Sequence, residues 1–286
     1  MKSPVLSILF LLISVTLLAV PNDFRFRHFS VEDGLSSNSV RAIMQDKYGF
    51  LWIGTEEGLN RYDGIMIKSY SICPQAAGKY ISSLYGTKKN IWIGTDEGIY
   101  IYAYATETFT YFDLTTPNNV RITSIVNHIL QDKDGNLWFS TNGQGLFRYN
   151  LSKNYLEQYE FTSAFGIVAS TMADSDNQIW ALTNQGESGV YKLNKAENKF
   201  EPFGLLYNAG NHHSQALAML EDSEQTLWLG TWECGLQKID KYTRQTTTYL
   251  HPTDGKGVTH IHSLMEYAPH QLLIGSDDGL LLFNTL

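Results

Sequence analysis

Apolar and polar residues alternate along most of this chain in short runs, and one run of this kind returns repeatedly. It is first seen at Leu51–Asp63, where LWIGT is followed by two glutamates, a glycine and LNRY. Alternating runs of about four to eight residues, separated by glycine-containing turns, predict short β-strands joined by tight hairpins. The pattern favours an all-β fold in which helices are nearly absent.

The run occurs six times, and each copy can be aligned on one large residue. These anchors lie 40 to 48 residues apart and are Trp52, Trp92, Trp138, Trp180, Trp228 and, without the indole, Leu273. A period of roughly 40–50 residues with several short strands per unit is typical of β-propeller blades. Residues 24–286 are therefore predicted to form one β-propeller of four-stranded antiparallel blades, with the tryptophans packed between neighbouring blades.

The first repeat sets the expected strand order. Strands A to D are predicted at Ser39–Gln45, Phe50–Thr55, Leu59–Tyr62 and Ile65–Tyr70. The last repeat stops after its strand C, whereas residues 24–29 alternate aromatic and polar side chains and resemble a strand D. We predict six blades, the last completed by residues 24–29, because this pairing removes the open edges of the array. An incomplete seven-bladed ring is the alternative.

Smaller residues recur around each anchor. A glycine follows two positions later in four repeats, a hydroxyl residue three positions later in all six, and an aspartate precedes the anchor by six positions at Asp46, Asp132, Asp174 and Asp222. Glycine permits close backbone packing, and the oxygen-bearing side chains suit turns. Recurrence within one chain indicates shared architecture, so these positions are interpreted as structural.

The first twenty residues differ from the rest. Lys2 is followed by an apolar run from Val5 to Val20, which predicts a secretory signal peptide over residues 1–20 and a periplasmic protein. An uncleaved N-terminal anchor is the alternative. The two cysteines, Cys73 and Cys234, fall in different repeats and are expected to be free thiols.

Composition narrows the function classes. The net charge is -8, and no run of lysine and arginine is present, which argues against a nucleic-acid partner. The sequence contains no nucleophile elbow, phosphate-binding glycine loop or zinc signature, so we expect no cofactor, no metal and no identifiable catalytic residue.

The chain resembles the two-component regulator propeller repeat. The resemblance rests on Phe29–Val40 (FSVEDGLSSNSV), on Gln45-Asp46 and on Leu51–Thr55, and it covers nearly everything after residue 20. It implies the exported sensor region of a hybrid two-component histidine kinase of Bacteroides-type bacteria, which senses glycan breakdown products. Such propellers usually have seven blades and precede kinase domains that this chain lacks. The resemblance thus implies a truncated or split sensor, or a stand-alone six-bladed relative.

Ligand-binding residues are expected on the face that carries the B–C turns and the D–A connections, because loops vary on a repetitive scaffold. Trp232 is the strongest candidate, since it places a second indole in a turn that is small and polar in other repeats. The remaining candidates are Asn38, Arg121, Asn142, Gln144, Asn184, His212, His213 and Glu233. Amides, charges, imidazoles and an aromatic ring together suit a sugar.

Three function classes stay open. The preferred one is a non-catalytic sensor that binds an oligosaccharide or another small ligand, with a homodimer and separate sensor-kinase domains as further candidate partners. The second is a propeller lyase or hydrolase that uses a histidine and a glutamate on the same face. The third is a protein-interaction scaffold. His260 and His262 could approach His212 and His213, but surface histidines are expected there rather than a metal centre.

Overall fold

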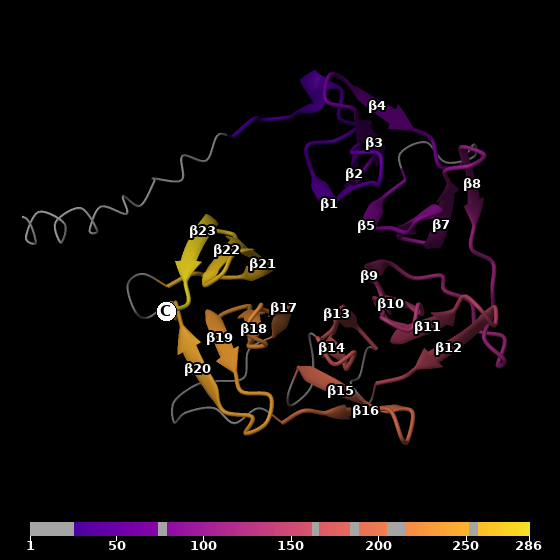
Figure 1. The fold of residues 1–286 in the computed structure, drawn as a ribbon. Helices are drawn as coiled ribbons and strands as arrows, with labels where there is room; N and C mark the ends of the chain where they lie inside the picture. The colour runs from indigo at the N-terminus through magenta and orange to yellow at the C-terminus, as the bar shows by residue number, and fades with distance from the viewer. Residues whose placement is uncertain (1–25, 74–78, 162–165, 184–188, 205–214, 252–256) are drawn as a thin grey trace, which may run out of the picture.

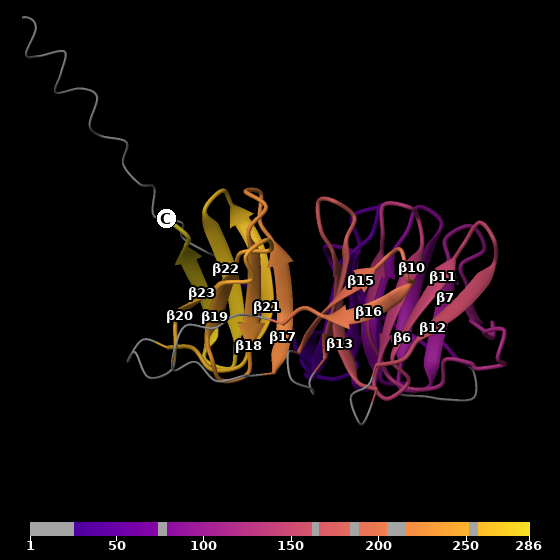
Figure 2. The ribbon, with the colours of Figure 1, turned by 90° about the horizontal axis from the view of Figure 1, so that it is seen from below.

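The computed structural model describes residues 26–286 except 74–78, 162–165, 184–188, 205–214 and 252–256. The chain is all-β, and its one described helix is the 3-10 turn η1 (Val31–Asp33). Six antiparallel sheets follow one another around a central axis, so the molecule is a six-bladed propeller (Figure 1). The disc is one blade thick, and the turns lie at its two faces (Figure 2).

The blades follow the predicted syntax. The first three are β1 (Val40–Gln45), β2 (Leu51–Thr55), β3 (Gly58–Tyr62), β4 (Ile67–Tyr70); β5 (Ile81–Gly86), β6 (Asn90–Thr95), β7 (Gly98–Ala103), β8 (Thr108–Tyr111); and β9 (Val126–Gln131), β10 (Leu137–Thr141), β11 (Leu146–Asn150), β12 (Tyr155–Tyr159). The last three are β13 (Val168–Ala173), β14 (Ile179–Thr183), β15 (Val190–Asn194), β16 (Lys199–Pro202); β17 (Ala216–Glu221), β18 (Leu227–Thr231), β19 (Leu236–Ile239), β20 (Thr246–Tyr249); and β21 (Ile261–Ala268), β22 (Gln271–Ser276), β23 (Gly279–Asn284). Strand A of each blade lies nearest the axis.

The last blade corrects one prediction. Its sheet contains only β21, β22 and β23 among the described residues, and residues 26–30 form no strand. Arg27 instead donates a 2.7 Å hydrogen bond to the Tyr62 hydroxyl of the first blade, and the Phe29 ring lies 4.8 Å from that of Tyr62. The prediction that residues 24–29 complete the last blade is therefore wrong for residues 26–29, because their aromatic and cationic side chains pack on the first blade. Residues 24 and 25 lie outside the described part.

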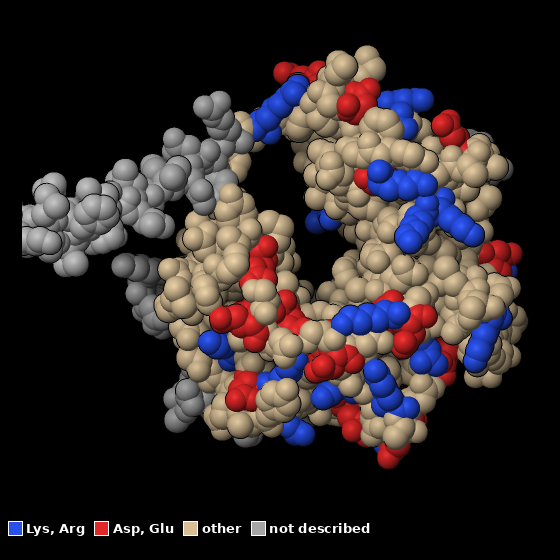
Figure 3. Space-filling view, in the orientation of Figure 1, with Lys and Arg blue, Asp and Glu red and all other residues tan. Residues whose placement is uncertain are grey.

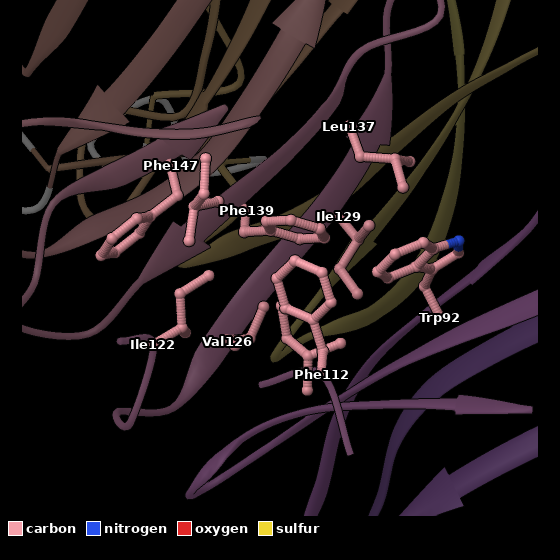
Figure 4. Close-up of a cluster of buried hydrophobic side chains, with 10 residues drawn as sticks. Trp92, Phe112, Ile122, Val126, Ile129, Leu137, Phe139 and Phe147 are labelled. Atoms are coloured by element: carbon pink, nitrogen blue, oxygen red, sulfur yellow. The ribbon is translucent and has the colours of Figure 1, made fainter. Parts of the chain in front are cut away.

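The core consists of aromatic and aliphatic layers between successive blades. Figure 4 shows one layer, in which Trp92 of the second blade meets Phe139 of the third at 5.7 Å between ring centroids. The predicted inter-blade role of the anchors is confirmed, since all five anchor tryptophans are at most 3% exposed and lie in the hydrophobic clusters between blades. Burying such a ring contributes about 1.5–3 kcal/mol or more, so these layers hold neighbouring blades together.

The recurring aspartates fasten the anchors. In four blades the indole Nε1 donates to the aspartate Oδ2 at 2.7–3.0 Å, while Oδ1 accepts backbone N–H groups of the A–B turn. In the second blade this turn is one residue shorter, and Thr87 takes the turn-capping role by accepting from Asn90 N at 3.0 Å. A single hydroxyl cannot serve both tasks, so Trp92 Nε1 is buried without a partner in the described structure.

The glycines after the anchors receive a side chain from the next blade. A methyl group added to Gly54 or Gly230 would come within 2.5 Å of Cγ2 of Ile81 or Ile261, the first residue of the following strand A. In the fourth blade the equivalent position is Leu182 instead of glycine. The first residue of the next strand A is then the small Ala216, which belongs to the same core cluster as Leu182. The two positions are thus matched in size, as close packing requires.

Neither Cys73 nor Cys234 forms a disulfide bond, as predicted. None of the helices in the described residues is both long enough and apolar enough to span a bilayer. The predicted signal peptide, residues 1–20, lies outside the described part of the chain.

Candidate functional site

Trp232 reaches the surface because its hairpin is longer than the two-residue hairpins of the first two blades. Four residues, Trp232 to Gly235, separate β18 from β19. The Thr231 side chain fixes the backbone of this turn, because its Oγ1 donates to the Gly235 carbonyl at 2.8 Å and accepts from Cys234 N at 3.0 Å. Cys234 is buried, whereas Trp232 is 39% exposed. The indole is therefore presented on the face of the disc by a fixed backbone.

The next blade provides a second ring. His260 stacks on Trp232 with 3.8 Å between ring centroids and an interplanar angle of 26°. Backbone bonds fix the pair, since Trp232 N donates to the Gln215 carbonyl at 2.9 Å and His260 N donates to the Trp232 carbonyl at 3.0 Å. His260 adopts a left-handed backbone conformation, with φ of 46°, immediately before β21. This conformation is uncommon for a non-glycine residue.

A carboxylate joins two imidazoles beside the stacked pair. Asp277, in the B–C turn of the last blade, accepts hydrogen bonds from His260 Nδ1 and, at 2.8 Å, from His262 Nε2. The bond from His260, followed by that from His262, lowers the pKa of Asp277 below its usual value. His262 lies edge-on to Trp232 at 6.4 Å between centroids. We call Trp232, His260, His262 and Asp277 the Trp232 cluster.

The neighbouring aspartate fixes the segment that leads into β21. Asp278 Oδ2 accepts from both the backbone N and the Oγ1 of Thr259 at 2.9 Å, and these bonds lower the pKa of Asp278. The B–C turn of the last blade is thus tied to the D–A connection that carries His260. The cluster is held by backbone and carboxylate contacts before any ligand arrives.

The Trp232 cluster offers three kinds of contact on one surface. The indole gives an apolar platform, the imidazoles give ring nitrogens that donate or accept, and the carboxylate accepts. Such groups can recognise a ring with one apolar face and several hydroxyls. A histidine paired with a carboxylate can also move protons. No group of three or more histidine, cysteine, aspartate or glutamate residues suited to a metal ion is found in the described ranges.

The other predicted residues do not join this cluster. Gln144 is occupied, because its Oε1 accepts from Thr123 N and Ser124 N at 2.8 and 3.0 Å and its Nε2 donates to the Arg121 carbonyl at 2.9 Å. The Arg121 guanidinium forms an ion pair with Asp113 at 2.7 Å. Both therefore stabilise the connection between the second and third blades.

The remaining predictions divide into two groups. Asn38 Oδ1 accepts from Val31 N at 2.9 Å and so caps the loop around η1, whereas the side chains of Asn142 and Glu233 are exposed. Asn184, His212 and His213 lie outside the described residues. His260, His262 and Asp277 were not among the predicted binding residues; the signal that could have indicated them is the pair of histidines beside a neighbouring tryptophan-bearing turn.

The described surface also has open pockets away from this cluster. A cavity of about 420 Å³ lies along β19 and β20, lined by Gln225, Lys238 and Tyr242 among others. Another, of about 410 Å³, lies between the second and third blades beside Trp92, Tyr111 and Tyr149. Neither is lined by a member of the Trp232 cluster, which is an open platform rather than a closed pocket.

Comparison with known proteins agrees with the repeat pattern. Residues 34–57 and 120–143 match the sequence profile of the family described as "Two component regulator propeller". A segment of 68 residues is 46% identical to Histidine kinase P4 of Formosa agariphila; it covers 24% of this chain and 5% of that protein.

Two solved structures show the same fold. The extracellular domain of the putative hybrid two component system BT3049 from B. thetaiotaomicron superposes with a TM-score of 0.73 at 24% identity, over 90% of this chain and 35% of that one. A catalytically inactive variant of virginiamycin B lyase from Staphylococcus aureus, solved with quinupristin, gives 0.63 at 14% identity, over 86% and 84%. The chain thus spans about a third of the length of the sensor domain that it resembles.

Proposed function

We propose that this chain, which is built from two-component regulator propeller repeats, is an exported sensor propeller that binds a small sugar-like ligand on the Trp232 cluster. The observation that carries the proposal is the fixed, 39% exposed indole of Trp232 beside two imidazoles and a carboxylate. An oligosaccharide derived from a glycan fits, because each ring has an apolar face for the indole and hydroxyls for the polar groups.

The similarities to the sensor domain and to the histidine kinase support a role in signalling by a longer assembly. In that assembly this propeller contributes ligand recognition, and kinase domains outside residues 1–286 contribute phosphotransfer. We propose a periplasmic location, which the predicted signal peptide and the printed description of the similar structure as an extracellular domain support.

The test is a thermal-shift screen of the chain against neutral and acidic oligosaccharides. A ligand at 100 times its Kd adds about 2.7 kcal/mol to the stability of the bound protein, which is a measurable shift. Each hit is repeated with Trp232→Ala, with His262→Ala and with Tyr242→Ala, an 83% exposed aromatic on the C–D turn of the fifth blade, as the matched control. The proposal is supported if Trp232→Ala and His262→Ala lose the ligand-induced shift while Tyr242→Ala keeps it. A ligand that still shifts the melting temperature of Trp232→Ala contradicts this site.

A second function has a specific observation in its favour. The pairing of His260 and His262 with Asp277 resembles a proton-transfer arrangement, and the lyase structure shares the propeller fold. In this reading an imidazole acts as acid or base on a bound ring. Mass spectrometry of every ligand found in the screen separates the two functions, because turnover that is lost in Asp277→Asn favours the lyase and binding without turnover favours the sensor.

A further inference from the structure

Grooves of one kind recur at the rim of the disc, between the second and third, the third and fourth, and the fourth and fifth blades. One wall of each groove includes strand C of a blade, and the other includes the C–D turn of the next blade. Figure 3, which shows the side of the disc with the A–B and C–D turns, has lysine and arginine side chains beside acidic ones over β15, β16 and β19. The B–C turn of Trp232 lies at the opposite ends of the strands, so these grooves are separate from the Trp232 cluster.

The groove between the third and fourth blades is closed by its own side chains. Arg148 forms an ion pair with Glu157, whose Oε2 also lies 3.0 Å from the Tyr159 hydroxyl. Asn198, on the C–D turn of the fourth blade, donates from Nδ2 to Glu157 Oε1 at 2.6 Å, and its Oδ1 lies 2.8 Å from the Tyr159 hydroxyl. The cation is thus neutralised within the chain, and the remaining cavity is only about 160 Å³.

The groove between the fourth and fifth blades has a cation at the same place without this neutralisation. Lys192 pairs with its anchor tryptophan across the sheet, as Arg148 does in the third blade. Glu201 lies opposite Lys192 on strand D, but its carboxylate contacts Lys199 Nζ at 3.4 Å and accepts from Asn194 Nδ2 at 3.2 Å. The ammonium of Lys192 therefore has no carboxylate partner in the residues that the structure describes.

The two side chains that close the previous groove are also replaced. Phe203 stands where Tyr159 stands, so the hydroxyl is lost. Arg244 stands where Asn198 stands, since each is the left-handed residue at the end of its C–D turn, with φ of 65° and 51°. Arg244 Cζ lies 5.2 Å from the centre of the Phe203 ring, and its guanidinium is exposed. The cavity is about 310 Å³ here, at the lower end of the roughly 300–1,000 Å³ of small-molecule sites.

Two positive charges thus line one groove without a carboxylate partner. Lys192 Nζ lies 5.2 Å from the Trp180 ring and is half-buried, whereas Arg244 approaches from the next blade. Lys241 is a third cation in the wall, but it is bound to Glu221 at 2.5 Å. In a chain with a net charge of -8, this concentration of unpaired positive charge in a concave site favours an anion.

We propose that the groove between the fourth and fifth blades binds a small oxyanion, a carboxylate, sulfate or phosphate group, between the Arg244 guanidinium and the Lys192 ammonium. A guanidinium donates to two oxygens of such a group side by side, and an ammonium donates as a point charge. The anion joins the two blades, as the Glu157 carboxylate joins the third and fourth. It is either free in solution or carried on a ring compound, for which the exposed Pro202 in the wall offers an apolar contact.

The experiment is a calorimetric titration of the full chain with sodium sulfate, sodium phosphate and sodium glucuronate, at an ionic strength held constant with chloride. Glucose is the neutral match for glucuronate. We expect one site with a Kd of about 1 mM or tighter and no heat from glucose. Arg244→Gln and Lys192→Gln should each weaken binding by about tenfold or more, because each removes a charge-assisted hydrogen bond. Lys195→Gln, an exposed cation on the C–D turn of the fourth blade, should leave it unchanged.

A second variant tests the site without leaving a hole in the groove. Arg244→Asn combined with Phe203→Tyr rebuilds the amide and hydroxyl that close the previous groove. This variant should melt cooperatively, like the parent, and should not bind the anion. The affinities also identify the source of the anion, because equal affinity for sulfate or phosphate and for glucuronate indicates a free inorganic anion, whereas a preference for glucuronate indicates an acidic ring.

Three results overturn the proposal. The first is the absence of saturable heat from all three anions at about ten times the expected Kd. The second is binding that Arg244→Gln leaves intact, or that Lys195→Gln weakens equally, since the anion then responds to surface charge in general. The third is loss of binding in Trp232→Ala, which would place the anion on the Trp232 cluster. An oligosaccharide screen without a hit, in contrast, bears only on that cluster.

Discussion

The hydrogen bonds that Asp174 accepts are together expected to stabilise the fourth blade by about 2–5 kcal/mol. Trp180 is 0% exposed, and its Nε1 donates to Asp174 Oδ2 at 3.0 Å. Asp174→Ala leaves this donor buried without a partner, which costs about 1–3 kcal/mol. It also removes the bonds from Asp176 N and Gln178 N at 3.0 and 2.8 Å, which water can partly replace, at about 0.5–1 kcal/mol each.

The expected loss is therefore about 2–5 kcal/mol, or a fall in melting temperature of about 2 °C per kcal/mol for a chain of this size. Urea unfolding followed by far-UV circular dichroism measures it, because this signal does not depend on the indole. A cycle of Asp174→Ala, Trp180→Phe and the double variant should give a coupling energy of about 1–2 kcal/mol.

The second blade provides the control for this prediction. Trp92 is equally buried but its Nε1 has no partner in the described structure, so Trp92→Phe removes ring surface without breaking a hydrogen bond. It should be less damaging than Trp180→Phe, which leaves the Asp174 carboxylate without its indole donor. A cost of less than about 1 kcal/mol for Asp174→Ala, or a coupling energy of zero while both single variants remain folded, would contradict this role of Asp174.

Four further outcomes are expected. Thr87→Asp should stabilise the chain by about 1 kcal/mol by giving Trp92 Nε1 an acceptor, and the gain, measured by urea unfolding, should vanish in a Trp92→Phe background. Burial lowers the pKa of His128 to about 4, so the folded state holds this imidazole neutral. The free energy of unfolding should therefore be highest, as far as His128 is concerned, above about pH 6.5 and should fall by up to about 3 kcal/mol as the pH drops toward 4. In thermal melts over this pH range, His128→Gln should lose less stability than the parent by about that amount. Gly230→Ala should destabilise the folded chain by about 1–3 kcal/mol in thermal melts, because the added methyl would meet Ile261 Cγ2 at 2.5 Å. Gly64→Ala has open space around the added methyl, so it should destabilise the chain only through the strain of a left-handed backbone at a non-glycine residue. Asp277→Asn should weaken the binding of any ligand found in the screen, by about tenfold in calorimetry, because His260 and His262 lose the carboxylate that orients them; equal affinity in variant and parent would place the ligand elsewhere.

The fold could be predicted in detail because the information is local and repeated. The spacing of Trp52, Trp92 and Trp138 fixes the period, and alternation within each copy fixes which side chains enter the core. The closure of the array could not be predicted in the same way. It depends on where residues 26–29 pack, and the contact of Arg27 and Phe29 with Tyr62 is made by side chains that have no counterpart in the repeat.

Of the four residues in the Trp232 cluster, the sequence indicates only Trp232 as a candidate for binding. That residue departs from its repeat, and the departure is visible in the sequence. The role of His260 depends on a left-handed backbone and on the stacking of rings from two blades, and neither is encoded by spacing. Gln144 shows the opposite limit: a polar residue in an exposed turn is predicted to be available to a ligand, and only the structure shows that backbone groups already bind its side chain.

The size match between Leu182 and Ala216 limits how the gene for such a protein can be rearranged. The fourth blade presents Leu182, on β14, to a following blade whose first strand begins with alanine, whereas the blades that present glycine are followed by a β-branched residue. Duplication of a repeat between like neighbours conserves these matches, but exchange of the fourth or fifth blade with another one breaks two of them at once. The order of the blades is thus inherited as a unit, even though each blade is built to the same plan.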